Sequence, residues 1–133
     1  MVLFGAPVSM EDHATSAVRA GLAMVQAVNS NARVWEQHHF PALRIGVGVH
    51  SGPAVIGAIG SGVRKDYTAN GDTINTASRV EGETKQHGVE VLITAATFQR
   101  LARFPELRAR CQAIAEPVSL KGKAEVMQLY QVQ

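Results

Sequence analysis

A run of alternating side chains over residues 43–50 most constrains what this chain can fold into. Its apolar members are Leu43, Ile45, Val47 and Val49, and the residues between them are Arg44, Gly46, Gly48 and His50. A period of two predicts a β-strand that buries one face. The tripeptide Ser51-Gly52-Pro53 predicts a turn, so we expect residues 54–59 to form a second strand that pairs back on the first.

Helical patterns lie on both sides of this strand. Apolar residues recur at three- and four-residue spacing after Asp12, which is a favourable N-cap, and the predicted helix frays at Asn29-Ser30-Asn31. A second helix is predicted over residues 72–86, with Asp72 as its cap and Gly88 at its end.

Shorter apolar segments complete the predicted elements. Residues 1–4, 89–93 and 126–132 predict strands, and residues 95–102 predict a short helix. Helices and strands alternate along the chain, yet two strands form a hairpin. We therefore expect an α+β fold, with helices packed on a mixed, mainly antiparallel sheet.

Composition excludes several classes of protein. The 133 residues carry a formal net charge of only +2 with dispersed basic side chains, and 5% of them are aromatic, so we expect no nucleic-acid partner. No run of 18 apolar residues is present, so no membrane contact is expected from this segment. The single cysteine, Cys111, fits a cytoplasmic location, although a membrane-anchored parent protein stays possible. We expect Cys111 itself to be a small core residue.

Three stretches of the sequence, in this order, resemble the catalytic domain of class III adenylate and guanylate cyclases. They are Val2-Leu3-Phe4-Gly5-Ala6-Pro7 with Asp12-His13-Ala14, then Arg44-Ile45-Gly46-Val47-Gly48-Val49-His50-Ser51-Gly52, then Asp66-Tyr67-Thr68-Ala69-Asn70-Gly71-Asp72-Thr73-Ile74-Asn75-Thr76-Ala77-Ser78-Arg79. The turn Leu120-Lys121-Gly122-Lys123 also fits. The resemblance covers essentially the whole chain, so residues 1–133 are interpreted as one partial nucleotide cyclase catalytic domain of the bacterial type.

The resemblance implies a ferredoxin-like fold that lacks its first strand and helices. It also implies that the complete enzyme converts ATP to 3′,5′-cyclic AMP and pyrophosphate with two Mg²⁺ or Mn²⁺ ions. The family's metal carboxylates belong to a segment upstream of Met1, so no metal ligand is expected in this chain. Active sites of the family form between two domains, so the resemblance implies a homodimer with ATP at its interface.

Four residues match positions with known roles in the family. Asn75 and Arg79 are four residues apart, which places them on one face of a helix. The resemblance implies that Asn75 orients the ribose and that Arg79 stabilises charge on the transferring phosphorus. It also implies that Thr68 selects the purine and that Lys121 binds the terminal phosphates.

Less specific interpretations stay open for the same residues. An Asn-x-x-x-Arg pattern on a helix is usually a solvated face, and Lys121 lies in what is also an ordinary exposed turn. His50 is interpreted as structural. At the level of the whole chain, the alternatives are a degenerate cyclase-like regulatory or dimerisation module without activity, and an unrelated α+β interaction domain.

Overall fold

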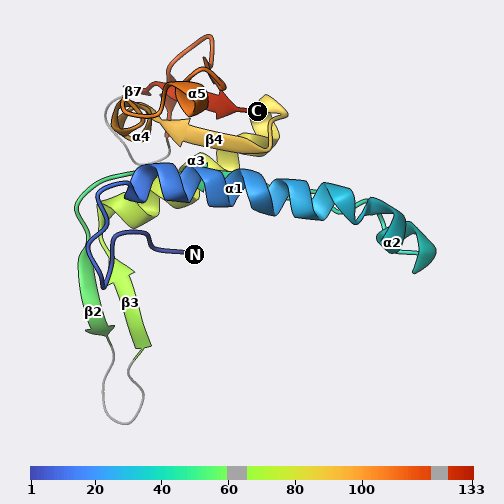
Figure 1. Cartoon of the computed structure of the whole chain (residues 1–133), viewed down its shortest axis with the longest axis horizontal. Coiled ribbons are helices and arrows are strands. Elements are labelled where there is room, and N and C mark those ends of the chain that lie inside the picture. The colour runs from blue at the N-terminus through green and yellow to red at the C-terminus, as the bar shows by residue number, and fades with distance from the viewer. Residues whose placement is uncertain (60–65, 121–125) are drawn as a thin grey trace.

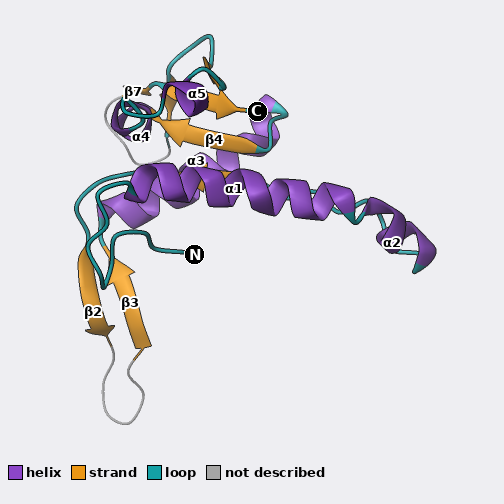
Figure 2. Cartoon of the chain, in the orientation of Figure 1, coloured by secondary structure: helices purple, strands orange, loops and turns teal. Residues whose placement is uncertain are grey.

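A four-stranded sheet forms the centre of the computed structural model, which describes residues 1–59, 66–120 and 126–133 (Figure 1). Its strands, in spatial order, are β1 (Val47–Val49), β4 (Val91–Thr94), β8 (Leu129–Val132) and β5 (Cys111–Ala113). Strand β1 pairs in parallel with β4, whereas β4 and β5 both pair antiparallel with β8. The predicted α+β fold with a mixed, mainly antiparallel sheet is therefore confirmed (Figure 2).

Two long helices cover opposite faces of this sheet, α1 (His13–Ser30) and α3 (Asp72–His87). Successive side chains of β4 alternate between the faces: Val91 and Ile93 pack in one core cluster with Val18 of α1. Leu92 packs in a second cluster with Val80 of α3. All four residues of β4 are buried, so this strand is the centre of the hydrophobic core.

Three short helices and a small two-stranded ribbon make up the remaining described elements. The helices are α2 (Ala32–Gln37), α4 (Ala95–Arg100) and α5 (Pro105–Arg108). Strands β6 (Val118–Ser119) and β7 (Val126–Met127) pair with each other. Among the described helices, none combines the length and the apolar character that crossing a membrane requires.

The N-cap residue predicted for α1 is confirmed, whereas the one predicted for α3 is wrong. Asp12 occupies the N-cap position of α1 as expected, although its carboxylate accepts a hydrogen bond from Ser16 Oγ (3.4 Å) and from no backbone N–H of the helix. The assignment of Asp72 as a cap was wrong, because Gly71 is the N-cap of α3 and Asp72 is its first helical residue. Gly88 ends α3 in the left-handed conformation (φ 65°), as predicted.

Strand β2 (Val55–Ile59) does not pair with β1, which corrects the hairpin expected over residues 43–59. It pairs antiparallel with β3 (Asp66–Asn70), and the two strands form an arm that projects from the body of the protein (Figure 1). The loop between β1 and β2 accounts for this, because its Ser51 is hydrogen-bonded to Thr97 of α4, which directs the chain away from β1. All five residues of β2 then pair with β3.

The expected strand over residues 1–4 was also wrong. This segment is assigned to no strand, and within the described residues no backbone ladder includes it. A strand is stable only when its N–H and C=O groups find a neighbouring strand, and an apolar composition alone does not supply one.

Candidate functional site

Helix α3 carries two of the four predicted site residues. Its buried residues are Thr76, Val80 and Thr84, which face the sheet. Asn75 and Arg79 each precede one of these residues by a single position, so both project about 100° round the helix from the buried face. Asn75 is exposed and Arg79 is half-buried. The structure therefore brings this pair together, one helical turn apart, at the surface.

The guanidinium of Arg79 enters none of the ion pairs formed between side chains that the structure describes. A half-buried arginine can hold a planar, forked donor set in a restricted orientation, which suits the recognition of phosphate oxygens.

Thr68 and Lys121 are placed less fully. Thr68 lies in the middle of β3, where its backbone pairs with Gly57 of β2. Strand β3 leads through Gly71 directly into α3, so Thr68, Asn75 and Arg79 belong to two consecutive elements. Lys121 lies outside the described residues.

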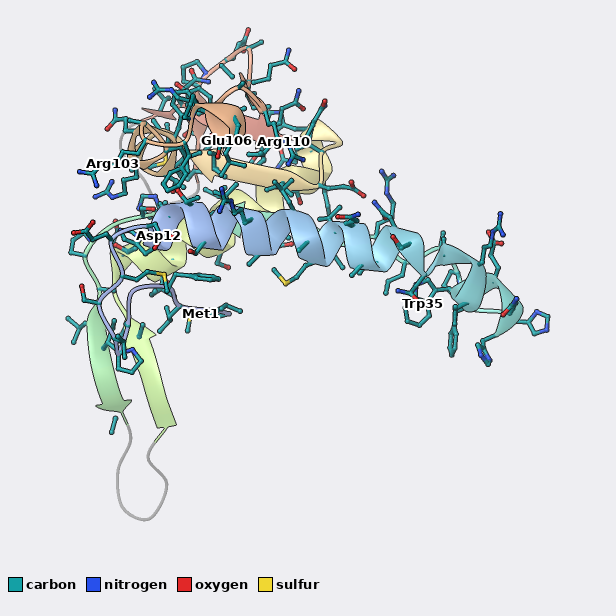
Figure 3. The ribbon with its side chains drawn as sticks, in the orientation of Figure 1. Met1, Asp12, Trp35, Arg103, Glu106 and Arg110 are labelled. Atoms are coloured by element: carbon teal, nitrogen blue, oxygen red, sulfur yellow. The ribbon has the colours of Figure 1, made fainter. Side chains whose placement is uncertain are left out.

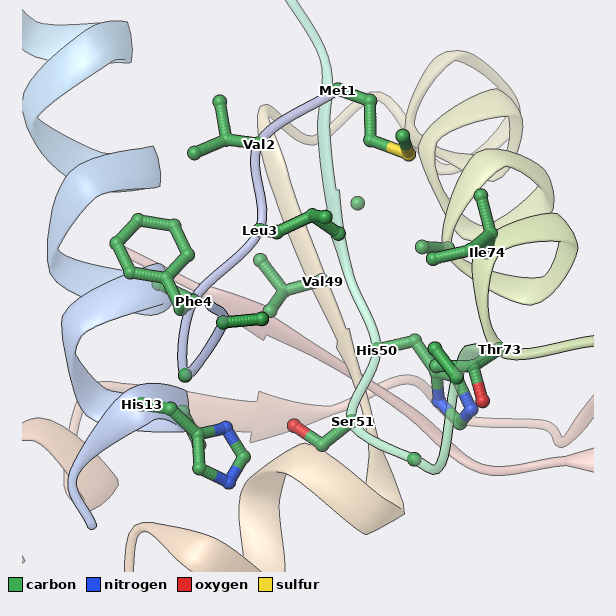
Figure 4. Close-up of a pocket in the computed structure, with 18 of the residues that line it drawn as sticks. Met1, Val2, Leu3, Phe4, His13, Val49, His50, Ser51, Thr73 and Ile74 are labelled. Carbon is green, nitrogen blue, oxygen red and sulfur yellow. The ribbon is translucent and has the colours of Figure 1, made fainter. Parts of the chain in front are cut away.

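A cavity formed by the described residues has neither Asn75 nor Arg79 in its lining. Its volume is about 700 Å³, and it lies between the N-terminal segment, α1, β1 and α3 (Figure 4). The lining is mainly apolar and includes Leu3, Val49 and Ile74. On α3, the residues that line the cavity lie on a different side of the helix from Asn75 and Arg79.

This cavity borders the edge of β1 that pairs with no other strand among the described residues. The Val47 N–H donates to the Glu90 carbonyl on the side of β4. Residues at alternate positions of a parallel strand direct their N–H and C=O groups to opposite sides, so the backbone of Gly48 points away from β4. Gly48 also lines the cavity. The cavity is therefore an apolar space beside a strand edge, a geometry that suits another strand better than a polar ligand.

The loop after β1 is tied to three elements by side-chain hydrogen bonds. His50 Nδ1 lies 2.9 Å from Thr94 Oγ1 at the end of β4, and Ser51 Oγ lies 3.0 Å from Thr97 Oγ1 in α4. On the other side, Thr73 Oγ1 of α3 donates to the Pro53 carbonyl at 2.5 Å. Sequence reasoning missed this arrangement, although Thr73 stands between Thr68 and Asn75 in the most specific matching stretch.

Comparison with known proteins decides the family. The family described as "Adenylate and Guanylate cyclase catalytic domain" matches residues 1–133. The chain belongs to this family. The predicted resemblance to class III nucleotide cyclases is therefore confirmed over the whole chain.

Two relatives and two solved structures illustrate the match. The chain is 33% identical to "Adenylate cyclase 1" of Rhizobium meliloti (strain 1021), over 98% of the chain and 19% of that protein. It is 39% identical to "Adenylate cyclase" of Anabaena cylindrica, over 69% of the chain and 18% of that protein. The adenylyl cyclase CyaB from P. aeruginosa and the guanylyl cyclase Cya2 both superpose with a TM-score of 0.81 at 26% identity. These superpositions include 98% and 97% of the residues of the chain, respectively.

The cyclase chain described here is shorter than all four of these proteins. It spans less than a fifth of the two curated relatives, and 64% and 62% of the two structural neighbours. The fold of the chain agrees with the folds of the two structural neighbours over nearly its whole length, which confirms the expected class III cyclase fold.

Cyclase domains of this family are generally metal-dependent. Within the parts of the chain that the structure describes, no three His, Cys, Asp or Glu side chains lie close enough together to hold a metal ion. Mg²⁺ and Mn²⁺ need several oxygen ligands, so the described residues do not fit a metal site by themselves.

Cys111 has the environment of a packing residue. It is half-buried beside the core cluster that contains Val132, and its Sγ lies 3.4 Å from the Leu107 carbonyl. Burial raises the pKa of the Cys111 thiol, and the nearby Arg108 and Arg110 guanidinium groups oppose this only in part. A thiol that stays protonated is a poor nucleophile. Cys111 was expected to be a small core residue, and it packs against the core cluster while staying partly exposed.

Proposed function

We propose that this chain is part of an adenylate cyclase, which converts ATP to 3′,5′-cyclic AMP and pyrophosphate. The observation that carries the proposal is the pair Asn75 and Arg79, one turn apart on the side of α3 that turns away from the core. Two of the most similar relatives bear the name adenylate cyclase. Guanylate cyclases are similar as well, so the choice of ATP depends on Thr68 at the position that the resemblance assigns to purine selection.

The residue types suit the roles that the resemblance implies. The amide of Asn75 can hydrogen-bond the ribose and so align its 3′-hydroxyl with the α-phosphate. The fork of Arg79 can stabilise the charge that develops on the phosphorus oxygens in the transition state. The hydroxyl of Thr68 would contact the adenine edge, and the ammonium group of Lys121 would bind the terminal phosphates.

We propose that two copies of the complete domain form a head-to-tail homodimer with ATP at the interface. The exposure of Asn75 supports this, because phosphoryl chemistry gains from a site that excludes water, and one chain leaves this side of α3 open. The projecting arm supports it too. Val55 of β2 is 74% exposed, and its apolar side chain is a contact that a second copy would cover.

The metal ligands belong, in this proposal, to a segment that precedes residue 1 in the complete protein. The apolar cavity and the open edge of β1 support a strand there, because such a strand would satisfy the backbone of Gly48 and bury the cavity lining. Two Mg²⁺ or Mn²⁺ ions bound by that segment would supply Lewis-acid activation of the reacting hydroxyl and phosphate. The cytoplasm is the proposed location, in agreement with the single unpaired Cys111.

Replacing Arg79 in the full-length protein tests the proposal. Arg79→Ala should lower turnover by on the order of a hundredfold or more, with a much smaller change in KM, because the contact strengthens in the transition state. Arg79→Lys should recover little, since a point charge does not reproduce the planar fork. Cyclic AMP formation is measured against ATP concentration, beside thermal unfolding of each variant.

Lys85→Ala is the matched control for this experiment. It removes one positive charge from an exposed position in the last turn of α3, and turnover should stay unchanged. Full turnover by a folded Arg79→Ala variant would remove Arg79 from the mechanism. That result would favour the solvated-face interpretation and a degenerate module without activity.

A further inference from the structure

The geometry points to Thr73 as a positioning residue that fixes the first turn of α3, and through it Asn75, against the loop after β1. Its Oγ1 donates to the Pro53 carbonyl at 2.5 Å across 20 positions of sequence. This inference rests on the proposed function, because it assigns Thr73 a role in the same reaction.

The contact closes the base of the arm. Pro53 lies two residues before β2, and Thr73 lies three residues after β3, whose first register pair is Val55 with Asn70. The hydrogen bond therefore joins the segments that flank β2 and β3, at the point where the arm meets the body of the protein. A displacement of the arm is transmitted to α3 through this bond.

The start of α3 depends on contacts from outside the helix. Its N-cap is Gly71, which has no side chain and makes no side-chain capping hydrogen bond. Thr73 is the second helical residue, and Asn75 follows two positions later in the same first turn. Fixing Thr73 therefore restricts the direction in which the Asn75 amide points.

The loop that accepts this hydrogen bond is itself rigidly held. His50 and Ser51 tie it to Thr94 and Thr97, at 2.9 and 3.0 Å respectively. A Cβ added at Gly52 would lie 2.7 Å from Thr73 Oγ1, so loop and helix are already in close contact. Figure 4 shows His50 and Thr73 side by side at one end of the cavity. Thr73 is thus connected through the loop to the central strand β4.

A positional error in Asn75 affects the reaction more than it affects substrate binding. Holding a reacting group in its productive geometry can contribute orders of magnitude to the rate, and an error of about 1 Å can cost on the order of a hundredfold. Thr73→Val keeps the size of the side chain and removes only the donor. We expect it to lower kcat by about tenfold or more, while KM changes by less than about threefold.

The experiment compares four variants of the full-length protein, with cyclic AMP formation from ATP as the assay. Thr73→Ser keeps the hydroxyl and should recover at least about half of the wild-type kcat. Thr84→Val is the matched control, since its hydroxyl donates to the Glu81 carbonyl within α3 and not to the loop after β1, so kcat should stay at the wild-type value. Thr73→Val should also add little to an Asn75→Ala background, because a residue that acts through Asn75 has no effect once the amide is gone.

Each outcome decides between positioning and simple stability. Equal kcat values for Thr73→Val and Thr84→Val would overturn the inference, as would a full additive loss in the Asn75→Ala background. Failure of Thr73→Ser to exceed Thr73→Val would also overturn it. A wild-type protein that makes no cyclic AMP contradicts the proposed function itself, whereas an active wild-type protein with an insensitive Thr73 contradicts only this inference.

Discussion

Replacing Gly48 with alanine should force α3 away from the sheet. A Cβ at this position would lie 2.2 Å from the Glu81 N and 2.6 Å from the Ala77 carbonyl oxygen, both of them backbone atoms of α3. Ordinary contact begins near 3.4 Å, so the helix must retreat by about 1.2 Å at this point. Overpacking of this kind costs roughly 1–3 kcal/mol, and backbone atoms cannot relax as a side chain can.

Thermal unfolding of the purified chain measures this cost. At about 3–5 °C per kcal/mol for a domain of this size, Gly48→Ala should lower the Tm by about 3–15 °C. In the full-length protein the same variant should also lower cyclic AMP formation, because the displaced helix carries Asn75 and Arg79.

Gly82→Ala is the control on the same helix. A Cβ at Gly82 meets no atom within 4 Å, so the substitution should stabilise the helix by roughly 0.5–1 kcal/mol through lower flexibility of the unfolded chain. A Gly48→Ala protein that unfolds at or above the temperature of Gly82→Ala would refute the close packing of α3 on β1.

Three other outcomes are expected. The 133-residue chain alone should make no cyclic AMP from Mg-ATP or Mn-ATP, because the described residues offer no metal cluster, and robust turnover by the pure chain would contradict this. Cys111 should react with a disulfide reagent more slowly than a free cysteine at pH 8, because its raised pKa leaves less thiolate, and should approach the free rate only at a higher pH. Leu92→Ala should lower the free energy of unfolding, measured by urea titration, by about 2–5 kcal/mol, because Leu92 is fully buried beside Val80 and Leu129. A loss below about 1 kcal/mol would place the core elsewhere.

Local patterns predicted the helices well. The second helix was expected over residues 72–86 and runs over Asp72–His87, because its period and its terminal Gly88 are both set by nearby sequence. Strand β8 and helix α4 fall within the segments predicted for them, and β4 extends one residue beyond its predicted end at Ile93. The cap of α3 was misassigned by one residue, since Gly71 and Asp72 are both acceptable before a helix.

Strand pairing was harder to predict, because it depends on residues far apart in the sequence. The partner of Val47 is Val91, and no local turn signal indicates that pairing. Residues 66–70 carry a β-favouring Tyr-Thr pair bounded by Gly71, so the strand β3 was recognisable from composition. The turn at residues 51–53 was instead read as a hairpin, because the hydrogen bonds that hold this loop to Thr94 and Thr97 come from residues far away in the sequence.

The candidate site was predicted from the resemblance to the cyclase family, and the cavity described above does not include its Asn75 and Arg79. The cavity of about 700 Å³ is apolar and lies beside a strand edge, which suits it to being filled by protein. Asn75 is exposed and Arg79 half-buried on α3, which is what the proposed site shared between two copies requires, since each copy would supply only part of its walls. In the proposed dimer, the second copy completes the site around Asn75 and Arg79. Each chain must therefore hold these two side chains in position before the other copy binds. The hydrogen bond from Thr73 to the loop after β1 and the close packing of Gly48 under α3 both supply that rigidity, so substitutions at either position should impair catalysis without touching ATP.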